Sequence, residues 1–141
     1  TERDYQMTLE TDRKTRDYLY GRLLAIAENI ESRALFVARE TRDTTAARLM
    51  QRFADRPYST WRTIELALVP YKTRLRASRG GFLFKMDVLL DDVMGAFSGD
   101  DFTQDGPLSG EFLLGYHCQR QALKPSDETS PAQEPATDSV E

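Results

Sequence analysis

Cysteine and histidine are almost absent from this sequence of 141 residues, which has only Cys118 and His117. A single cysteine excludes an internal disulfide and a cysteine-based zinc site, and it suits a reducing compartment. No apolar run approaches the roughly 18 residues that are needed to cross a bilayer, and the first residues have none of the features of a signal peptide. We therefore expect a soluble, cytoplasmic protein that contacts no membrane.

Recognisable catalytic motifs are also missing. His117 and Cys118 are neighbours, and adjacent side chains on a helix point about 100° apart, so the two do not form a catalytic dyad. Gly80-Gly81 is not followed by the Lys-Ser or Lys-Thr of a phosphate-binding loop. The acidic loop at 101–105 lacks the later ligands of a calcium loop. We expect no enzymatic activity, no cofactor and no metal ion, and the roles of His117 and Cys118 stay open.

Apolar residues recur at helical spacing and nowhere alternate with polar ones, which predicts an all-α protein. Pro57 ends a helix, because the residue before a proline avoids helical angles, whereas Pro70 either kinks a helix or separates two. We expect a bundle of about five helices within residues 13–124, after a lead-in at 1–12. An acidic tail at 125–141, rich in Pro, Ser and Thr, is predicted to be disordered. The expected helices run from Asp12 or Thr15 to Glu40, from Thr44 or Thr45 to Asp55, from Ser59 or Thr60 to about Arg79, from Phe82 to Phe97, and over 112–123.

Charge is distributed unevenly along the chain, although the net charge is only −4. Residues 13–85 hold 16 Lys or Arg against 7 Asp or Glu, whereas residues 86–141 hold 2 against 12. Arg accounts for 15 of the 19 basic residues, and its guanidinium group forms bidentate contacts with phosphate. The asymmetry predicts a basic surface for a polyanion and an acidic surface elsewhere. The arginine excess alone is equally typical of a GC-rich genome.

Many of the basic residues fall into short helical rows. Arg48, Arg52 and Arg56 recur every four residues, so their guanidinium groups are expected about 6 Å apart, a spacing that can follow a phosphate backbone. A second cluster runs into Gly80-Gly81, and a further pair lies on one flank of the first helix. The alternative for each group is an ordinary solvated helix face. The candidate nucleic-acid contacts are Arg22, Arg33, Arg48, Arg52, Arg56, Lys72, Arg74, Arg76 and Arg79.

The expected helix at 82–97 has a second apolar strip, formed by Phe84 and Val88. A helix that is apolar on two sides lies at the centre of a bundle or at an interface. Arg120 falls at the edge of the apolar face of the last helix, which favours a structural or partner contact over a contact with DNA. The candidate protein-interface residues are therefore Phe84, Val88 and Arg120.

Two segments resemble a known family. Residues 112–123, Phe-Leu-Leu-Gly-Tyr-His-Cys-Gln-Arg-Gln-Ala-Leu, join an apolar stripe to a Gln-Arg-Gln triplet, and residues 18–30 begin with Tyr-Leu-Tyr-Gly-Arg-Leu. Both segments resemble the C-terminal region of the large subunit of type I-C CRISPR Cascade complexes, a region that is also made separately as the small subunit. The similarity covers roughly residues 18–124. The chain departs from the family at Tyr116-His117-Cys118, where Tyr-Tyr-His is usual.

The resemblance implies a non-catalytic subunit of an RNA-guided surveillance complex. Its partners would be the Cascade backbone and large subunits, a second copy of itself, crRNA and target DNA. In this interpretation the arginine rows stabilise the R-loop by sequence-independent contacts to the nucleic-acid backbone, with the displaced non-target strand as the first candidate. The alternatives are a scaffold that bridges the other subunits, or a free-standing helical nucleic-acid-binding protein that lacks a base-reading helix.

Overall fold

In the computed structural model, which describes residues 8–124, every regular element is a helix. This confirms the predicted all-α fold for that part of the chain. The tail at 125–141 and residues 1–7 of the lead-in lie outside the described residues. None of the described helices is long and apolar enough to cross a membrane. The elements are α1 (Arg16–Ala38), α2 (Thr45–Arg48), α3 (Met50–Asp55), α4 (Pro57–Ser78), α5 (Gly80–Gly95), the 3-10 turn η2 (Asp101–Thr103) and α6 (Glu111–Leu123).

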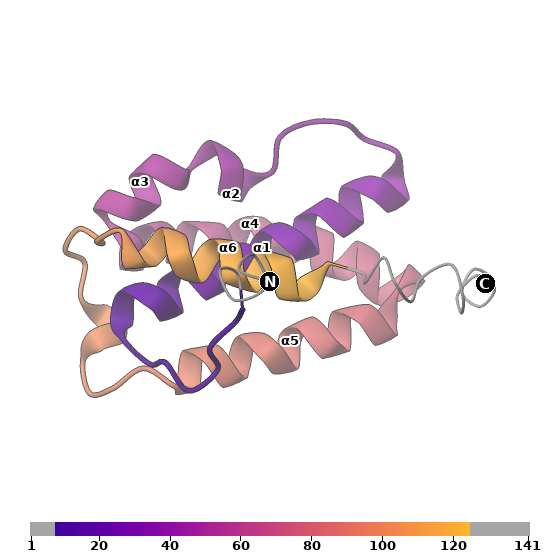
Figure 1. Ribbon diagram of the computed structural model, residues 1–141. Coiled ribbons are helices and arrows are strands. Elements are labelled where there is room, and N and C mark those ends of the chain that lie inside the picture. Colours follow the sequence, from indigo (N-terminus) through magenta and orange to yellow (C-terminus); the bar gives the residue numbers. More distant parts are fainter. Residues whose placement is uncertain (1–7, 125–141) are drawn as a thin grey trace.

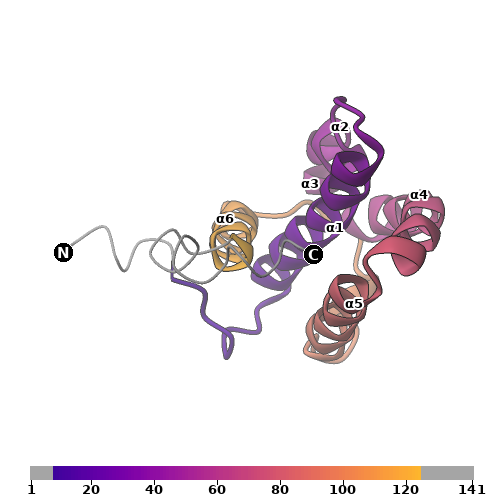
Figure 2. The same ribbon diagram turned by 90° about the vertical axis from the view of Figure 1, so that its right-hand side faces the viewer.

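The first long helix, α1, occupies the centre of the bundle. Two perpendicular views place α1 between α6 and α4, with α2 and α3 along one side and α5 along the other (Figure 1 and Figure 2). Every residue from Tyr18 to Ala27 is buried, because neighbouring helices cover α1 on all sides. The central helix is thus α1 rather than α5, whose Phe84 is 69% exposed.

Aromatic side chains from several helices meet in the core around α1. Trp61 of α4 and Phe53 of α3 are almost completely buried. Tyr20 of α1 packs edge-on against Phe53, with ring centroids 5.6 Å apart. The Tyr20 hydroxyl donates a hydrogen bond to the backbone oxygen of Phe102, which attaches the loop before α6 to the core. Burial of a large apolar side chain stabilises the fold by about 2–3 kcal/mol.

The helices α1 and α6 cross at two glycines, Gly21 and Gly115. A Cβ atom at Gly21 would lie 2.1 Å from the backbone oxygen of Phe112, and one at Gly115 would lie 2.2 Å from the backbone oxygen of Tyr18. Both distances are far shorter than a van der Waals contact, so a side chain at either position would push the helices apart. Because glycine has no Cβ, the two helix backbones touch here.

The expected helix at 44–55 is divided into α2 and α3. The division lies at Leu49, which has φ −102° and ψ 13°. Its backbone groups still bond to Thr45 O at 2.9 Å and Phe53 N at 2.8 Å, so the break leaves them satisfied. The Thr44 hydroxyl caps α2 by accepting the backbone N–H of Ala47 at 3.1 Å.

The helix α4 begins at Pro57, slightly earlier than expected. Proline is favoured at the first helical position, because its φ suits a helix and it has no N–H to leave unpaired. The next N–H groups, of Tyr58 and Ser59, donate to the carboxylate of Asp105 at 2.9 and 3.1 Å. Asp105 thus caps α4 from the distant acidic loop, which links that loop to the start of the helix.

At two places where the sequence suggested a break between helices, the structure differs from the expectation. The helix α4 continues through Pro70 to Ser78, so separate helices on either side of Pro70 are the wrong alternative. Proline has no N–H to donate to the backbone carbonyl four residues earlier. Because Pro70 is exposed, water can bind that carbonyl instead. The chain turns at Arg79, with φ −140° and ψ 52°, and Gly80 and Gly81 form the first turn of α5 rather than a loop before it.

Replacing Gly115 with Ala is expected to destabilise the fold, although alanine favours helices over glycine by about 1 kcal/mol. The added Cβ would displace the backbone of Tyr18, and we expect the free energy of unfolding in urea to fall by about 2 kcal/mol. Gly81→Ala is the control, because no atom beyond the neighbouring backbone of its own helix lies within 4 Å of its new Cβ. That variant should be at least as stable as the natural chain. Equal losses of stability in the two variants would contradict a close crossing at Gly115.

The cap formed by Asp105 predicts a pH-dependent stability. Partial burial opposes ionisation of Asp105, but hydrogen bonds from Ser59 and Tyr58 and the nearby Arg56 outweigh it and lower its pKa. A lowered pKa stabilises the fold above the unfolded pKa of about 3.9, and the effect is lost as pH falls through the folded value.

We expect Asp105→Asn to lower the free energy of unfolding by about 1 kcal/mol at neutral pH. The difference from the natural chain should shrink as pH falls below about 4. Thermal unfolding across this pH range measures both effects. Asp100→Asn, at an exposed position in the same loop, is the control. If the difference in free energy of unfolding between the Asp105 variant and the natural chain stayed constant down to about pH 3, the carboxylate would not be its origin.

Candidate nucleic-acid interface

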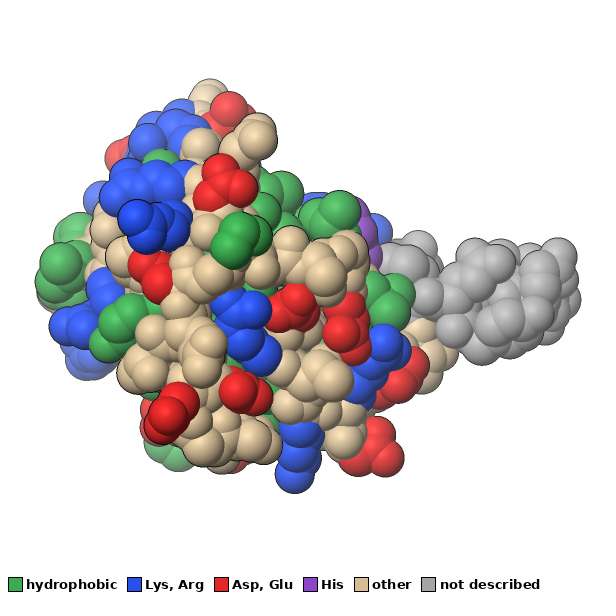
Figure 3. All heavy atoms as spheres, turned by 90° about the vertical axis from the view of Figure 1, so that its left-hand side faces the viewer, with side chains coloured by type: hydrophobic (Ala, Val, Ile, Leu, Met, Phe, Trp, Pro, Cys, Tyr) green, Lys and Arg blue, Asp and Glu red, His purple; other side chains and the backbone are tan. Residues whose placement is uncertain are grey.

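The row formed by Arg48, Arg52 and Arg56 lies on the surface of α2, α3 and the α3–α4 junction. Buried Ala46 and Phe53 hold the opposite side of these short helices against the core. Figure 3 shows Lys and Arg side chains gathered in the upper left of the face that includes the end of α3 and the start of α4, with acidic side chains scattered among and below them. The short helices therefore present their basic side outward.

The three arginines of the row differ in how strongly the protein holds them. Arg48 Nη2 donates to Thr45 Oγ1 at 3.2 Å. Arg56 lies 3.7 Å from the Asp105 carboxylate, but 64% of its side chain is exposed, so this ion pair is weak. Arg52 forms no side-chain hydrogen bond or ion pair with the described residues. Arg52 is thus the member of the row with the most freedom to pair with an outside anion.

The second basic cluster divides into two parts. Lys72 Nζ lies 2.9 Å from Asp87 Oδ1 and joins α4 to α5. Arg74 lies 4.0 Å from Glu40 and joins α4 to the residues after α1. Arg76 and Arg79 are exposed and form no ion pair within residues 8–124. The first two residues therefore hold helices together, while the last two face solvent at the α4–α5 junction.

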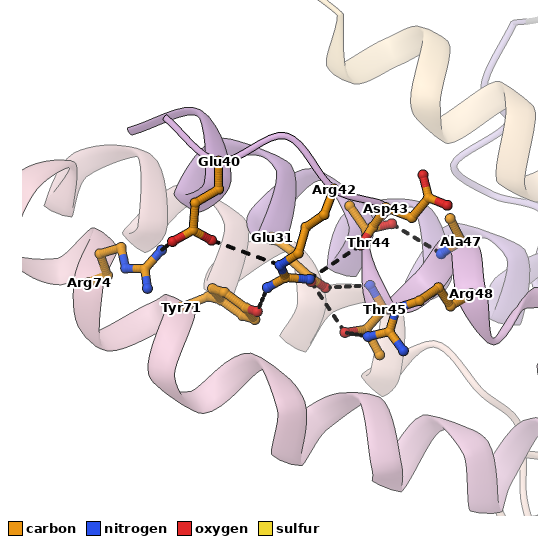
Figure 4. Close-up of polar contacts among 10 residues, drawn as sticks. All are labelled: Glu31, Glu40, Arg42, Asp43, Thr44, Thr45, Ala47, Arg48, Tyr71 and Arg74. Atoms are coloured by element: carbon orange, nitrogen blue, oxygen red, sulfur yellow. Dashed lines mark hydrogen bonds and ion pairs between the residues drawn. The ribbon is translucent and has the colours of Figure 1, made fainter. Parts of the chain in front are cut away.

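A buried carboxylate, Glu31 of α1, positions the beginning of α2. Its Oε1 accepts the backbone N–H of Thr45 at 2.9 Å, and its Oε2 accepts the Thr45 hydroxyl at 3.2 Å and Arg42 Nη1 at 3.4 Å (Figure 4). The Glu31 side chain is only 2% exposed, so these bonds replace those that water would make. Because Thr45 also accepts Arg48, Glu31 fixes the base of the first basic row.

Arg42 extends this network to α4. It donates to the Tyr71 hydroxyl, and its guanidinium carbon lies 5.5 Å from the centre of the Tyr71 ring. Glu40 lies between Arg42 and Arg74, at 3.8 and 4.0 Å from their nitrogens (Figure 4). The loop between α1 and α2 is therefore tied to α4 by charged groups, which places the two basic clusters relative to each other.

Sequence reasoning missed Glu31 and Arg42 as positioning residues. Glu31 carried a usable signal, because it lies at helical spacing from the apolar residues Ala27 and Ala34. A charged residue in such a stripe is buried only when it has partners. Arg42 carried no comparable signal, since it lies outside the expected helices and the partners that connect it to α1 and α4, Glu31 and Tyr71, are distant in the sequence.

Arg22, one of the candidate contacts, is only 5% exposed. Its Nε donates to Gln119 Oε1 at 2.7 Å, and burial lowers the pKa of the guanidinium group. Its exposed edge reaches a hollow that Lys14 and Asp92 also line, so a carboxylate stands near its charge. The observed role of Arg22 is to join α1 to α6.

Arg120 also joins α6 to α1. Its Nε lies 3.5 Å from Glu28 Oε1, and its guanidinium carbon lies 5.5 Å from the centre of the Tyr116 ring. The Tyr116 hydroxyl donates to the same Glu28 oxygen at 2.6 Å. Burial, together with the Glu28 carboxylate, raises the pKa of Tyr116. The Arg120 side chain remains 49% exposed, so part of it is still open to a partner.

The other candidate residues lie around α5. Arg33 stands over the ring of Phe82 at 5.0 Å and connects α1 to the start of this helix. Phe84 and Val88, one helical turn apart, are 69% and 43% exposed. Residues 8–124 therefore leave this apolar strip of α5 uncovered.

His117 and Cys118 face different sides of α6. Cys118 is buried, whereas His117 is exposed and packs its ring against Tyr116 at 5.1 Å between centroids. Within the described part of the chain, no group of three or more His, Cys, Asp and Glu side chains is placed to hold a metal ion. The contact that the structure gives His117 is thus with its neighbour in the same helix.

The crossing of α1 and α6 unites the two segments that carry the family resemblance. The pairs Gly21 with Gly115 and Arg22 with Gln119 connect residues 18–30 to residues 112–123. A family model described as CRISPR-associated protein (Cas_Csd1) matches residues 1–124. The chain belongs to this Cas_Csd1 family. No curated protein matches this Cas_Csd1 family member as a relative.

Breaking the pair between Arg22 and Gln119 is expected to destabilise this Cas_Csd1 fold. Gln119→Leu leaves a buried guanidinium group without its acceptor, and we expect the free energy of unfolding in urea to fall by about 2–3 kcal/mol. The double variant with Arg22→Met should lose less stability than the sum of the two single changes, because the unpaired charge is gone. Gln121→Leu, at an exposed position on the same helix, is the control. Strictly additive effects would contradict a direct pair.

Proposed function

We propose that the chain is a non-catalytic small subunit of a type I-C Cascade-like complex and that it stabilises the R-loop by contacts to the nucleic-acid backbone. Membership of a CRISPR-associated family supports a role within a CRISPR complex. The observation that carries the mechanism is that three exposed arginines among the candidate contacts form no side-chain hydrogen bond or ion pair with the described residues. These are Arg52 on α3 and Arg76 and Arg79 at the α4–α5 junction.

An electrostatic role of this kind suits the energetics of the R-loop. The RNA–DNA heteroduplex is about as stable as the DNA duplex that it replaces, so a small added stabilisation shifts the equilibrium. Each arginine that neutralises a phosphate releases condensed counterions, and this favours binding without reading the sequence. The displaced non-target strand is the first candidate, because its bases have lost their partner strand and protein contacts to its backbone can stabilise it as a single strand.

The remaining basic candidates receive different roles in this proposal. Arg48 and Arg56 are exposed and flank Arg52, so they extend the contact surface at its margins. Lys72 and Arg74 hold α4 in place through their own ion pairs. They position the contact surface and do not themselves bind the strand.

The surface of α5 is apolar and acidic rather than basic, and it suits a protein partner. Phe84 and Val88 form an exposed apolar strip on α5, and the same helix carries Asp87, Asp91 and Asp92. An apolar strip beside acidic groups favours a protein partner with basic residues over a nucleic acid. We assign this strip and the exposed part of Arg120 to contacts with the Cascade backbone subunits, the large subunit or a second copy of the chain.

A pure scaffold is the second candidate function. It is favoured by the exposed strip on α5 and by the internal pairing of several basic residues, among them Lys72 with Asp87. In this case the exposed arginines contact acidic groups of neighbouring subunits. The two functions differ in whether the arginines are needed for assembly or for binding of the target.

The test replaces Arg52, Arg76 and Arg79 with Gln in a guide-loaded complex and measures target-duplex affinity at two or more salt concentrations. Assembly should be unchanged, while the slope of log affinity against log salt should become shallower by about one for each arginine that no longer neutralises a phosphate. The control replaces Lys14, Arg62 and Lys85 with Gln, which removes the same charge elsewhere.

Assembly and binding are scored separately in this experiment. Failure of the Arg52, Arg76 and Arg79 variant to join the complex would overturn the phosphate role and favour the scaffold. The phosphate role would also be overturned if the control variant weakened target binding to the same extent. A natural chain that neither joins the complex nor changes target affinity would contradict both functions.

A further inference from the structure

A small hollow lies where α1 passes the end of α6. Its volume is about 180 Å³, which is below the range of roughly 300–1,000 Å³ that is typical of sites for larger ligands. This size suits a single small group rather than a whole nucleotide. The lining residues that bear on its chemistry are Glu28, Asn29, Ser32, Arg33, Arg120 and Lys124.

The charge of the hollow is predominantly positive. Arg33, Arg120 and Lys124 line it, and among its described lining residues Glu28 is the carboxylate. Glu28 is already engaged, because its Oε1 accepts the Tyr116 hydroxyl at 2.6 Å and lies 3.5 Å from Arg120 Nε. Arg33 and Lys124 form no ion pair with the described residues. Two cations therefore border the hollow without a counterion from this part of the chain.

Arg33 is held in place before any ligand arrives. Its guanidinium group stands over the Phe82 ring at 5.0 Å, and this contact restricts the long side chain. Contact with the ring face leaves the N–H groups at the guanidinium edge able to donate elsewhere. A planar group with several donors is well suited to the oxygens of a phosphate. Ser32 adds a neutral hydroxyl donor to the same lining.

One local effect opposes an anion at this place. The helix α6 ends at Leu123, and the carbonyl groups of its last turn carry a partial negative charge, equivalent to roughly half an elementary charge. The full charges of Arg33 and Lys124 exceed this effect. A ligand with one negative charge is therefore held by the side chains and not by the helix.

We propose that this hollow is a binding site for one phosphate group. The group belongs either to a nucleic-acid strand or to free phosphate, since both present the same tetrahedral oxygens. The site is separate from Arg52, Arg76 and Arg79, and it does not rest on their proposed contact with the R-loop. If the group belongs to a nucleic acid, the hollow adds a fixed point to the contact surface.

The test titrates the isolated full chain with inorganic phosphate and follows backbone and arginine N–H signals by NMR. We expect saturable shifts at Ser32, Arg33 and Lys124, with a dissociation constant on the order of 1 mM. Sodium chloride at matched ionic strength is the salt control. Arg33→Gln and Lys124→Gln should each weaken binding by about tenfold or more, since each removes a charge-assisted contact. Arg39→Gln removes an exposed cation at the end of α1, outside the hollow, and should leave binding unchanged.

Several results would overturn the site. These are the absence of saturable shifts, equal shifts with sodium chloride, and variants at Arg33 and Lys124 that bind as well as the natural chain. Thermal unfolding of each variant verifies that weaker binding does not come from a loss of fold. A short oligonucleotide with and without a 5′ phosphate identifies the source of the group. Tighter binding of the phosphorylated form indicates a terminal phosphate, and equal binding that both variants lose indicates a backbone phosphate.

Discussion

The backbone contact of α1 and α6 at Gly21 and Gly115 is the constraint on which the rest of the structure depends. Because neither residue has a Cβ, the helices approach closely enough for Arg22 to reach Gln119 and for Tyr116 to reach Glu28. The close approach also covers one side of α1, whose other sides pack against α2, α4 and α5. The two segments that carry the family resemblance are thus the two halves of one packing contact.

The helices and their apolar faces could be predicted from the sequence, because the helical spacing of apolar residues is visible within a short stretch of the chain. The boundaries were less predictable, since contacts from distant residues set them. Asp105 caps the first turn of α4 and so supports its start at Pro57. No pattern near Pro57 predicts a contact with a carboxylate 48 positions later. The break at Leu49 and the helical state of Gly80 likewise have no local signal.

The candidate site was predictable only as a list of exposed positions. Spacing places Arg48 and Arg52 on one side of a helix, but it does not show which cations find a partner on another helix. Lys72 pairs with Asp87 across two helices, and Arg22 is buried because α6 covers it. The buried carboxylate of Glu31 was missed for the same reason, since its partners lie beyond α1.

The bonds from Glu31 to the start of α2 have a consequence for genetics. If the arginines bind a strand as proposed, a screen for chains that fail to bind target would recover changes at Glu31 together with changes at the arginines. Glu31 has almost no surface, so such a hit would report on the orientation of α2 and not on contact with a strand. The exposed fraction of each side chain recovered in such a screen therefore has to be considered before the residue is assigned to the interface.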